Sequence, residues 1–273
     1  ALGAIPKRDS NDIRLIHDCS RPKGKSVNDY VSYKQKLQYQ TIQDAADLLS
    51  PHAFLAKVDL KGAYRSVKIS DSSTTATGLA WTFSGDKHPT YLIDTALPFG
   101  ASLAPQVFHR LTQAIRRMML RRGYKIIAFL DDFLIIEKSI DRCYHALVTL
   151  MTLLRKLGFA INYNKVIMPT QKLCFLGINI CSVTYTLELP EDKVQDLLIL
   201  LDTFRSRKRA TLKQLQKLAG KLNYASSVVF GGRCYLKRVL DIMRPLREAS
   251  HKAHLDIGFH MDLEWWIAYL RIF

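Results

Sequence analysis

Two adjacent carboxylates, Asp131 and Asp132, interrupt an otherwise apolar run over residues 126–136. A run this rich in Ile and Phe predicts a buried β-hairpin with the two acids at its turn. Burying neighbouring carboxylates is costly because each raises the pKa of the other, and a divalent cation is the usual compensation. Hard Mg²⁺ prefers carboxylate oxygens, so the pair predicts a metal site, with a solvated acidic turn as the alternative.

A third carboxylate ends an upstream strand. Residues 54–59 are predicted to form a strand that ends at Asp59, and Gly62, Ala63 and Tyr64 follow almost at once. The small Gly62 and Ala63 allow a ligand to approach the backbone closely. A carboxylate, a tight turn and an aromatic ring in this order suit a metal-bound nucleotide, although an Asp that merely ends a strand would look the same.

The bulk composition favours a polyanionic partner. The 273 residues are 48% hydrophobic, which suffices for one large domain or two to three subdomains. Lys and Arg outnumber Asp and Glu 40 to 24, and this net charge of +16 is typical of nucleic-acid binding, with solubility alone as the alternative. The five cysteines form no Cys-x-x-Cys pair, which favours a reduced, intracellular protein over a disulfide framework or zinc ribbon. The sequence shows neither a signal-peptide pattern nor an apolar run that could span a bilayer.

Several local elements are predicted to position these residues. Residues 5–18 read as a hairpin whose strands place Lys7 and Arg14 near a triphosphate, or as an ordinary solvated basic hairpin. A helix is predicted over 41–50, with Thr41 as its cap and Asp44 at the capping-box position. After a loop containing Pro98 and Gly100, Ser102 is expected to cap a helix that runs to about residue 122.

The rest of the chain reads as one more mixed segment followed by helices. A helix is predicted over 141–158, then an extended segment that ends at Lys165, then a strand pair over 173–180. The residues expected on the buried side of the first helix are Leu147, Leu150, Met151, Leu154 and Leu157. From residue 190 onward only helices are predicted, over about 191–205, 211–227, 233–250 and 260–271. The interval between Asp202 and Asp241 holds ten Lys or Arg and no acid, which marks a surface for phosphates or a solvated basic face.

Four motifs occur in order: residues 58–64 (Val-Asp-Leu-Lys-Gly-Ala-Tyr), 97–100 (Leu-Pro-Phe-Gly) with Ala104-Pro105, 129–132 (Phe-Leu-Asp-Asp) and 173–177 (Leu-Cys-Phe-Leu-Gly). Together they resemble the reverse transcriptases of retroelements over nearly the whole chain. Residues 215–226 are similar to the retroviral thumb helix. The loop over residues 14–29 resembles that of DIRS-type, tyrosine-recombinase retrotransposons.

The resemblance implies an α+β right-hand polymerase whose palm has an antiparallel sheet plus helices, with β-rich fingers and a helical thumb. The implied bounds are fingers at 1–53 and 79–96, palm at 54–78 and 97–189 including a primer-grip hairpin, and thumb at 190–250. Residues 251–273 would begin a connection to an RNase H-like domain. By the same resemblance, the N-terminal part of the fingers is missing or much reduced here. The chain is expected to be a polymerase core, either excised from a longer protein or a domain of a polyprotein that also carries RNase H.

The resemblance also implies roles for individual residues. Asp59 and Asp131 would hold two Mg²⁺ ions, or Mn²⁺ as a substitute, with Asp132 as a weaker ligand and Lys165 protonating pyrophosphate. The implied dNTP-binding residues are Lys7, Arg14, Gly62, Ala63, Tyr64 as steric gate, Phe99 and Gly100. The implied primer grip is Phe175, Leu176 and Gly177, and the implied duplex-binding residues are Lys213, Gln216, Lys217, Gly220, Lys221 and Tyr224.

The implied function is an RNA-directed DNA polymerase, also able to copy DNA, that extends a primer with dNTPs on an RNA or DNA template and contacts no membrane. One alternative is a catalytically silent, reverse-transcriptase-like module that only binds nucleic acid. The three carboxylates and the pair Lys7 and Arg14 are all present, which argues against it. The other alternative is an RNA-dependent RNA polymerase, and the bulk of Tyr64 argues against that.

Overall fold

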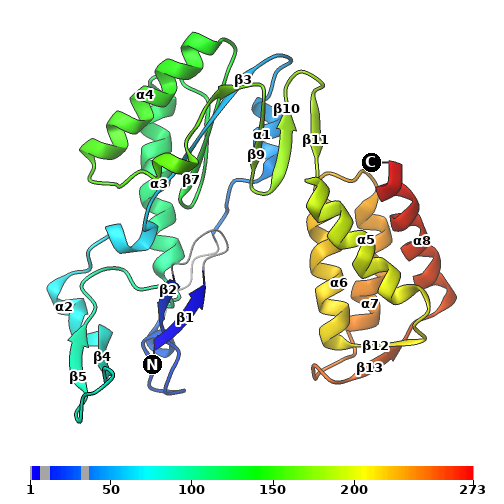
Figure 1. The fold of residues 1–273 in the computed structure, drawn as a ribbon, viewed down its shortest axis with the longest axis horizontal. Helices are drawn as coiled ribbons and strands as arrows, with labels where there is room; N and C mark the ends of the chain where they lie inside the picture. Colours follow the sequence, from blue (N-terminus) through cyan, green and yellow to red (C-terminus); the bar gives the residue numbers. More distant parts are fainter. Residues whose placement is uncertain (1, 7–12, 32–36, 273) are drawn as a thin grey trace. The chain divides into compact units, whose positions relative to one another are not determined.

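The computed structural model of the chain describes residues 2–6, 13–31 and 37–272 (Figure 1). The chain divides into two compact units. The first comprises Ala1–Leu48 and Ala53–Thr170, and the second comprises Leu49–His52 and Gln171–Phe273. The three carboxylates all belong to the first unit.

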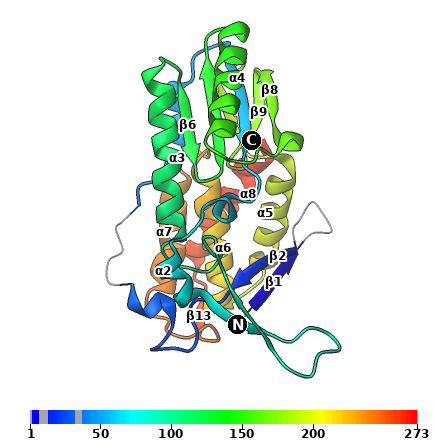
Figure 2. The same cartoon turned by 90° about the vertical axis from the view of Figure 1, so that its left-hand side faces the viewer.

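A four-stranded antiparallel sheet forms the centre of the first unit. Its strands lie in the order β6 (Ile126–Phe129), β7 (Asp132–Glu137), β3 (Phe54–Asp59) and β8 (Ile167–Thr170). Helices α3 (Ala104–Arg121) and α4 (Ile140–Lys156) lie along this sheet (Figures 1 and 2). Because strand side chains alternate between faces, Val58 and Phe133 join the core under the helices, while Lys57, Asp59 and Asp132 point to the opposite face.

Strand β6 lies at the edge of this sheet, and polar side chains cover its outward backbone groups. The Ala128 N–H donates to Gln40 Oε1 at 2.9 Å, and Gln113 Nε2 donates to the Ala128 carbonyl at 3.2 Å. Arg116 Nε donates to the Ile126 carbonyl at 3.1 Å. The buried backbone groups at this edge are therefore hydrogen-bonded, as buried polar groups generally are.

The ends of three helices test the predicted caps. Helix α1 (Ile42–Leu48) has the predicted capping box: the Thr41 N–H donates to Asp44 Oδ2 at 2.7 Å, and the Asp44 N–H donates to Thr41 Oγ1 at 3.4 Å. These hydrogen bonds from Thr41 lower the pKa of Asp44. The predicted Ser102 cap is wrong, because α3 starts at Ala104 with Leu103 as its N-cap and a proline in its first turn.

Helix α4 starts one residue earlier than predicted. Its N-cap is Ser139, whose Oγ accepts a hydrogen bond from the Arg142 N–H at 3.3 Å. Leu150 and Leu154 are buried as expected, but Leu157 is the C-cap and 46% exposed, so its predicted burial is wrong. The predicted extended segment before Lys165 is also wrong in part, because Tyr163–Lys165 forms a 3₁₀ turn, η4.

Two hairpins accompany the sheet in the first unit. Strands β1 (Leu2–Pro6) and β2 (Ile13–His17) pair antiparallel, which confirms the predicted N-terminal hairpin, although its turn over residues 7–12 lies outside the described residues. Strands β4 (Gly78–Trp81) and β5 (Thr90–Ile93) form the second hairpin. The remaining short elements of this unit are η1 (Val27–Tyr30), η2 (Ala63–Ser66), α2 (Asp71–Thr74) and η3 (Thr75–Thr77).

The second unit has a three-stranded meander, β9 (Lys172–Phe175), β10 (Ile178–Cys181) and β11 (Thr186–Glu188), followed by helices. The helices are α5 (Glu191–Arg205), α6 (Leu212–Ala225), α7 (Gly232–Met243) and α8 (Ile257–Ile272). The expectation of helices alone is wrong, because β12 (Arg209–Thr211) pairs with β13 (Lys252–His254). Both strands lie almost wholly in the gaps between the predicted helices, and α7 ends at Met243, before the predicted end at about residue 250. No helix within the described ranges has the length and apolar character needed to cross a bilayer.

Candidate active site

The structure brings the carboxylates to one end of the central sheet. Asp59, the last residue of β3, lies in register opposite Asp132, the first residue of β7. Asp131 occupies the turn between β6 and β7 after Leu130, whose φ is +49°, and its carbonyl accepts a hydrogen bond from the Leu60 N–H at 3.0 Å. The predicted hairpin with acids at its turn is confirmed.

Asn162 holds Asp59 in place. Its Nδ2 donates to Asp59 Oδ2 at 3.0 Å, and its backbone N–H donates to the Asp59 carbonyl at 2.9 Å. Asp59 is buried, so these contacts fix the direction of its carboxylate. Sequence reasoning missed Asn162, since a hydrogen bond between residues this far apart leaves no local pattern.

Lys57 pairs with Asp132, with 3.0 Å between Nζ and Oδ1. Burial raises the pKa of Asp132, Lys57 opposes the rise, Asp59 adds to it, and Lys165 opposes it. Lys57 was also missed, but here a signal exists. A lysine two positions before Asp59 in an apolar strand must share the face of that aspartate.

The donor chemistry of this cluster fits a hard divalent cation. Carboxylates concentrated at the end of a mostly buried sheet repel one another, and a cation relieves that repulsion. Within the described ranges, no group of three or more His, Cys, Asp or Glu forms a ready-made metal site. A bound ion would therefore complete its shell with backbone carbonyls, water or substrate phosphates, as Mg²⁺ usually does.

Four of the predicted dNTP-binding residues lie in two neighbouring segments. Gly62, at φ +68°, allows the turn that starts η2, and Ala63 is buried directly after it. The Tyr64 ring lies 4.9 Å from the Phe99 ring and 5.4 Å from the Phe108 ring, measured between centroids. The structure thus brings the predicted gate and the predicted nucleotide floor into contact.

The other three dNTP-binding predictions differ in how far the structure describes them. Gly100 has φ +120°, and a Cβ at this position would overlap the carbonyl oxygen of His17, so the close approach requires glycine. Arg14 lies on β2 in register with Ile5, but its side chain is outside the described part of the chain. Lys7 lies outside the described residues altogether.

The Asp94 carboxylate lies between Arg65 and His17 and braces the turn that contains Tyr64. Arg65 pairs with the Asp94 carboxylate, and Asp94 Oδ2 lies 4.0 Å from His17 Nδ1. Burial lowers the pKa of His17, with Asp94 opposing, so the imidazole is neutral near neutral pH. These three residues connect η2, the end of β5 and the end of β2, and sequence reasoning did not single them out.

In the second unit, the predicted primer grip forms the tight turn between β9 and β10. Phe175 is fully buried, and Leu176 and Gly177 both have positive φ, at +50° and +78°. Tyr224 on α6 donates a hydrogen bond from its hydroxyl to the Gly177 carbonyl at 2.5 Å. The structure therefore connects a predicted thumb residue directly to the predicted primer grip.

The predicted duplex-binding face of α6 is divided. Lys213, Gln216, Lys217 and Gly220 are exposed, opposite a buried leucine face. Lys221 is half-buried instead: its Nζ donates to the Asp196 carbonyl at 3.3 Å and lies 3.5 Å from the Asp196 carboxylate. Its charge is therefore partly committed to α5.

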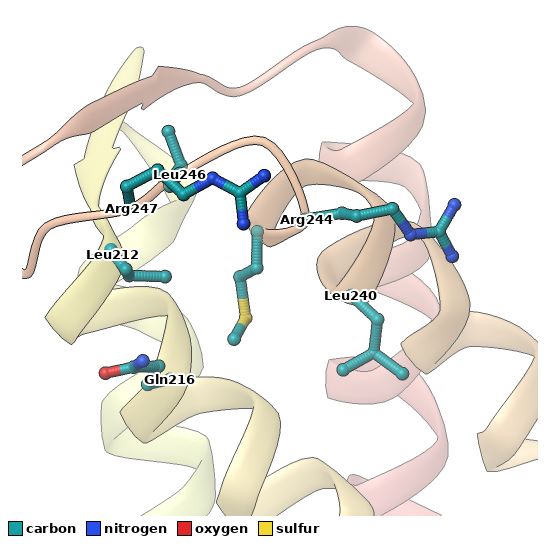
Figure 3. Close-up of a pocket in the computed structure, with 7 residues that line it drawn as sticks. Leu212, Gln216, Leu240, Arg244, Leu246 and Arg247 are labelled. Carbon is teal, nitrogen blue, oxygen red and sulfur yellow. The ribbon is translucent and has the colours of Figure 1, made fainter.

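An open pocket of about 520 Å³ lies beside this face (Figure 3). Its lining combines apolar side chains with Gln216 on α6 and two arginines, Arg244 and Arg247, at and after the end of α7. These arginines were missed because the acid-free interval was taken to end at Asp241. They extend the positive charge of the unit beyond the predicted helix face.

Comparison with solved structures identifies the fold. A foamy viral protease–reverse transcriptase in complex with dsDNA aligns with a TM-score of 0.76 at 17% identity, over 98% of this chain and 43% of that one. A foamy viral protease–reverse transcriptase in complex with an RNA/DNA hybrid aligns with a TM-score of 0.72 at 19% identity, over 99% of this chain and 33% of that one. The fold is therefore an α+β right-hand polymerase, as predicted.

The family follows from the sequence itself. Residues 5–180 match the family "Reverse transcriptase (RNA-dependent DNA polymerase)", and the chain belongs to that family. The genome polyprotein of Petunia vein clearing virus (isolate Shepherd) is 23% identical over 205 residues, which cover 75% of this chain and 8% of the polyprotein. Protein P of duck hepatitis B virus (strain China) is 23% identical over 245 residues, which cover 89% of this chain and 29% of that protein. This chain thus spans less than a third of either relative, and the DIRS-type resemblance stays a prediction.

Proposed function

We propose that this chain is the polymerase core of an RNA-directed DNA polymerase that also copies DNA, extending a primer with dNTPs. The observation that carries the proposal is the register of Asp59 opposite Asp132, with Asp131 in the adjoining turn. Enzymes of this family generally use divalent metal ions, and the carboxylate cluster has the donor chemistry for them.

In this proposal Asp59 and Asp131 would hold two Mg²⁺ ions, with Asp132 as a weaker ligand. Such ions supply activation of the primer 3′-hydroxyl and stabilisation of the leaving pyrophosphate. Asn162 keeps the Asp59 carboxylate aimed at its position through the 3.0 Å hydrogen bond, and Lys57 balances the charge of Asp132. Lys165 Nζ gives a proton to the pyrophosphate.

Nucleic acid binds along the second unit. The foamy viral relatives were solved with dsDNA and with an RNA/DNA hybrid, and this chain has a net charge of +16 with exposed Lys213 and Lys217. The turn of Leu176 and Gly177, held by Tyr224, positions the primer end, and Gln216 and Gly220 contact the duplex. We assign the fingers to 1–53 and 79–96, the palm to 54–78 and 97–189, and the thumb to 190–250.

The test is primer extension on an RNA template with Mg²⁺, with dNTPs in one reaction and rNTPs in another. Extension with dNTPs but not rNTPs is expected. Extension with rNTPs would point to an RNA polymerase. Silence in both reactions, together with retained duplex binding, would favour a module that only binds nucleic acid.

Replacing Tyr64 by Val should raise ribonucleotide use relative to dNTP use by about tenfold or more, since removing a steric clash in a pocket is worth about 1–3 kcal/mol. The ring packs against Phe99 and Phe108, so it cannot turn away from a ribose 2′-hydroxyl. Competition between dNTP and rNTP in single-nucleotide extension measures the ratio. Tyr91→Val, at an 81% exposed position on β5, is the matched control. An unchanged ratio in Tyr64→Val would remove Tyr64 as the gate.

Adding Mg²⁺ should raise the melting temperature of the chain in the absence of substrate. A ligand that binds the folded state at ten times its dissociation constant stabilises the protein by about 1.4 kcal/mol. The gain should shrink in Asp131→Asn, which removes a predicted ligand, and persist in Asp71→Asn, an exposed acid at the start of α2. Equal gains in both variants would place the stabilising ion elsewhere.

A further inference from the structure

The side chain of Asn28 makes three hydrogen bonds that join two segments of the first unit. Its Nδ2 donates to the Gly100 carbonyl at 2.9 Å and to Ser20 Oγ at 2.8 Å. Its Oδ1 accepts a hydrogen bond from the Ser102 N–H at 2.8 Å. Asn28 thus holds both ends of the segment 100–102, which lies just before α3.

The loop that carries Asn28 is itself rigidly built. The Asn28 N–H donates to the Cys19 carbonyl at 2.9 Å, so the loop closes on the end of β2. The neighbouring Asp29 carboxylate accepts hydrogen bonds from the Gly24 N–H at 2.8 Å and from the Ser26 N–H at 3.0 Å. Such local side-chain bonds to the backbone order a loop that has little regular structure.

The segment that Asn28 holds is continuous with the predicted nucleotide floor. The His17 N–H donates to the Phe99 carbonyl at 2.8 Å, and Gly100 lies directly against the His17 carbonyl. The Phe99 ring in turn contacts Tyr64. A shift at residues 100–102 would therefore displace Phe99 from the gate.

We propose that Asn28 is a positioning residue for nucleotide binding: it fixes residues 100–102 so that Phe99 stands against Tyr64 as the floor beneath the incoming dNTP. This inference rests on the proposed function. The segment after β2 would then affect nucleotide affinity although none of its side chains needs to touch the nucleotide.

The chemistry of the site requires a carboxamide. The Gly100 carbonyl needs a donor and the Ser102 N–H needs an acceptor, and Asn presents both on one short side chain. Aspartate would keep the bond to the Ser102 N–H but would oppose the Gly100 carbonyl with a second acceptor. Alanine would remove both bonds.

The test is steady-state primer extension by the whole chain with the variants Asn28→Ala, Asn28→Asp and Ser20→Ala. Asn28→Ala should raise the KM for dNTP about five- to tenfold, the effect expected for two lost hydrogen bonds, with kcat changed less than about twofold. Asn28→Asp should raise KM in the same direction, because it loses the donor to the Gly100 carbonyl and sets a charged acceptor against it. Ser20→Ala is the matched control, because it removes the one described side-chain hydrogen bond of Asn28 that does not reach the segment 100–102, and it should behave as wild type.

A double-variant cycle separates positioning from general weakening of the fold. If Asn28 acts through Phe99, Asn28→Ala should raise KM less than about twofold in a Phe99→Ala background, because coupled residues are not additive. Independent, multiplying effects would overturn the proposal, as would an Asn28→Ala variant that matches Ser20→Ala. An Asn28→Ala variant that does not fold leaves the decision to Asn28→Asp, whose unchanged KM would also overturn it.

Hydrogen exchange provides a readout that does not depend on polymerase activity. The Ser102 amide should exchange about tenfold faster in Asn28→Ala than in wild type, since its acceptor is gone, and at the wild-type rate in Ser20→Ala. A wild-type chain that fails to extend any primer would refute the proposed function, and the Ser102 amide would still decide whether Asn28 holds the loop. Unchanged exchange in Asn28→Ala would overturn the inference.

Discussion

Asp131→Asn should reduce nucleotide incorporation by about a hundred- to a thousandfold, the cost of removing one preorganised group at a site where charge develops. The change keeps the shape of the side chain and removes its charge, so a cation there would meet a neutral amide oxygen in place of an anionic carboxylate. Single-nucleotide extension measures the loss. Duplex binding and the melting temperature should stay close to wild type. The turn is held by a backbone hydrogen bond, from the Leu60 N–H to the Asp131 carbonyl, which the substitution does not remove.

Two comparisons sharpen this result. Asp141→Asn, in the first turn of α4 and away from the carboxylate cluster, should retain wild-type activity. Asp132→Asn should cost less activity than Asp131→Asn, because Lys57 already neutralises the Asp132 carboxylate. Near wild-type extension by Asp131→Asn would remove Asp131 from the proposed metal ligands.

Gly100→Ala should destabilise the first unit by about 2–5 kcal/mol, combining a strained left-handed backbone with overpacking. At φ +120° any Cβ is strained, and here it would also overlap the backbone carbonyl of His17. The hairpin of β1 and β2 must then separate from the segment that carries Phe99, so dNTP binding should be lost as well. Urea unfolding and the KM for dNTP measure the two effects.

Gly85→Ala is the control for backbone strain alone. Gly85 also has positive φ, at +95°, but a Cβ there would have no neighbour within 4 Å. Gly85→Ala should lower the free energy of unfolding by about 1 kcal/mol or little more. Equal losses in the two variants would mean that the close approach of Gly100 to His17 contributes nothing to stability.

Local patterns predicted the central parts of the site. The apolar run around Asp131 and Asp132 predicted a hairpin, and the structure has it. The order of Asp59, Gly62 and Tyr64 predicted a strand followed by a tight turn, and Gly62 does adopt positive φ. Both features depend on neighbours in sequence, where alternation, turn chemistry and steric limits act directly.

Contacts distant in sequence could not be predicted in the same way. A single side chain makes each of these contacts: Asn162 bonds to Asp59, and Asn28 bonds to Gly100 and Ser102. The error at Ser102 has the same origin: its amide is taken by Asn28, while the start of α3 is set by Pro105 and the packing of Ala104. The β12–β13 pairing likewise depends on partners some forty residues apart, in short segments between the predicted helices, where no local pattern shows the pairing.

The covering of strand β6 has a consequence for self-association. An edge strand with four mostly buried apolar residues would normally be a template on which another chain could add its own strand, the first step of aggregation. At Ala128 both backbone groups are already bonded to Gln40 and Gln113, so an incoming strand would have to displace both glutamines. These side chains come from the segment before α1 and from α3, so two separate parts of the chain close this edge. The sheet that positions the carboxylates is thereby kept from growing at its β6 edge.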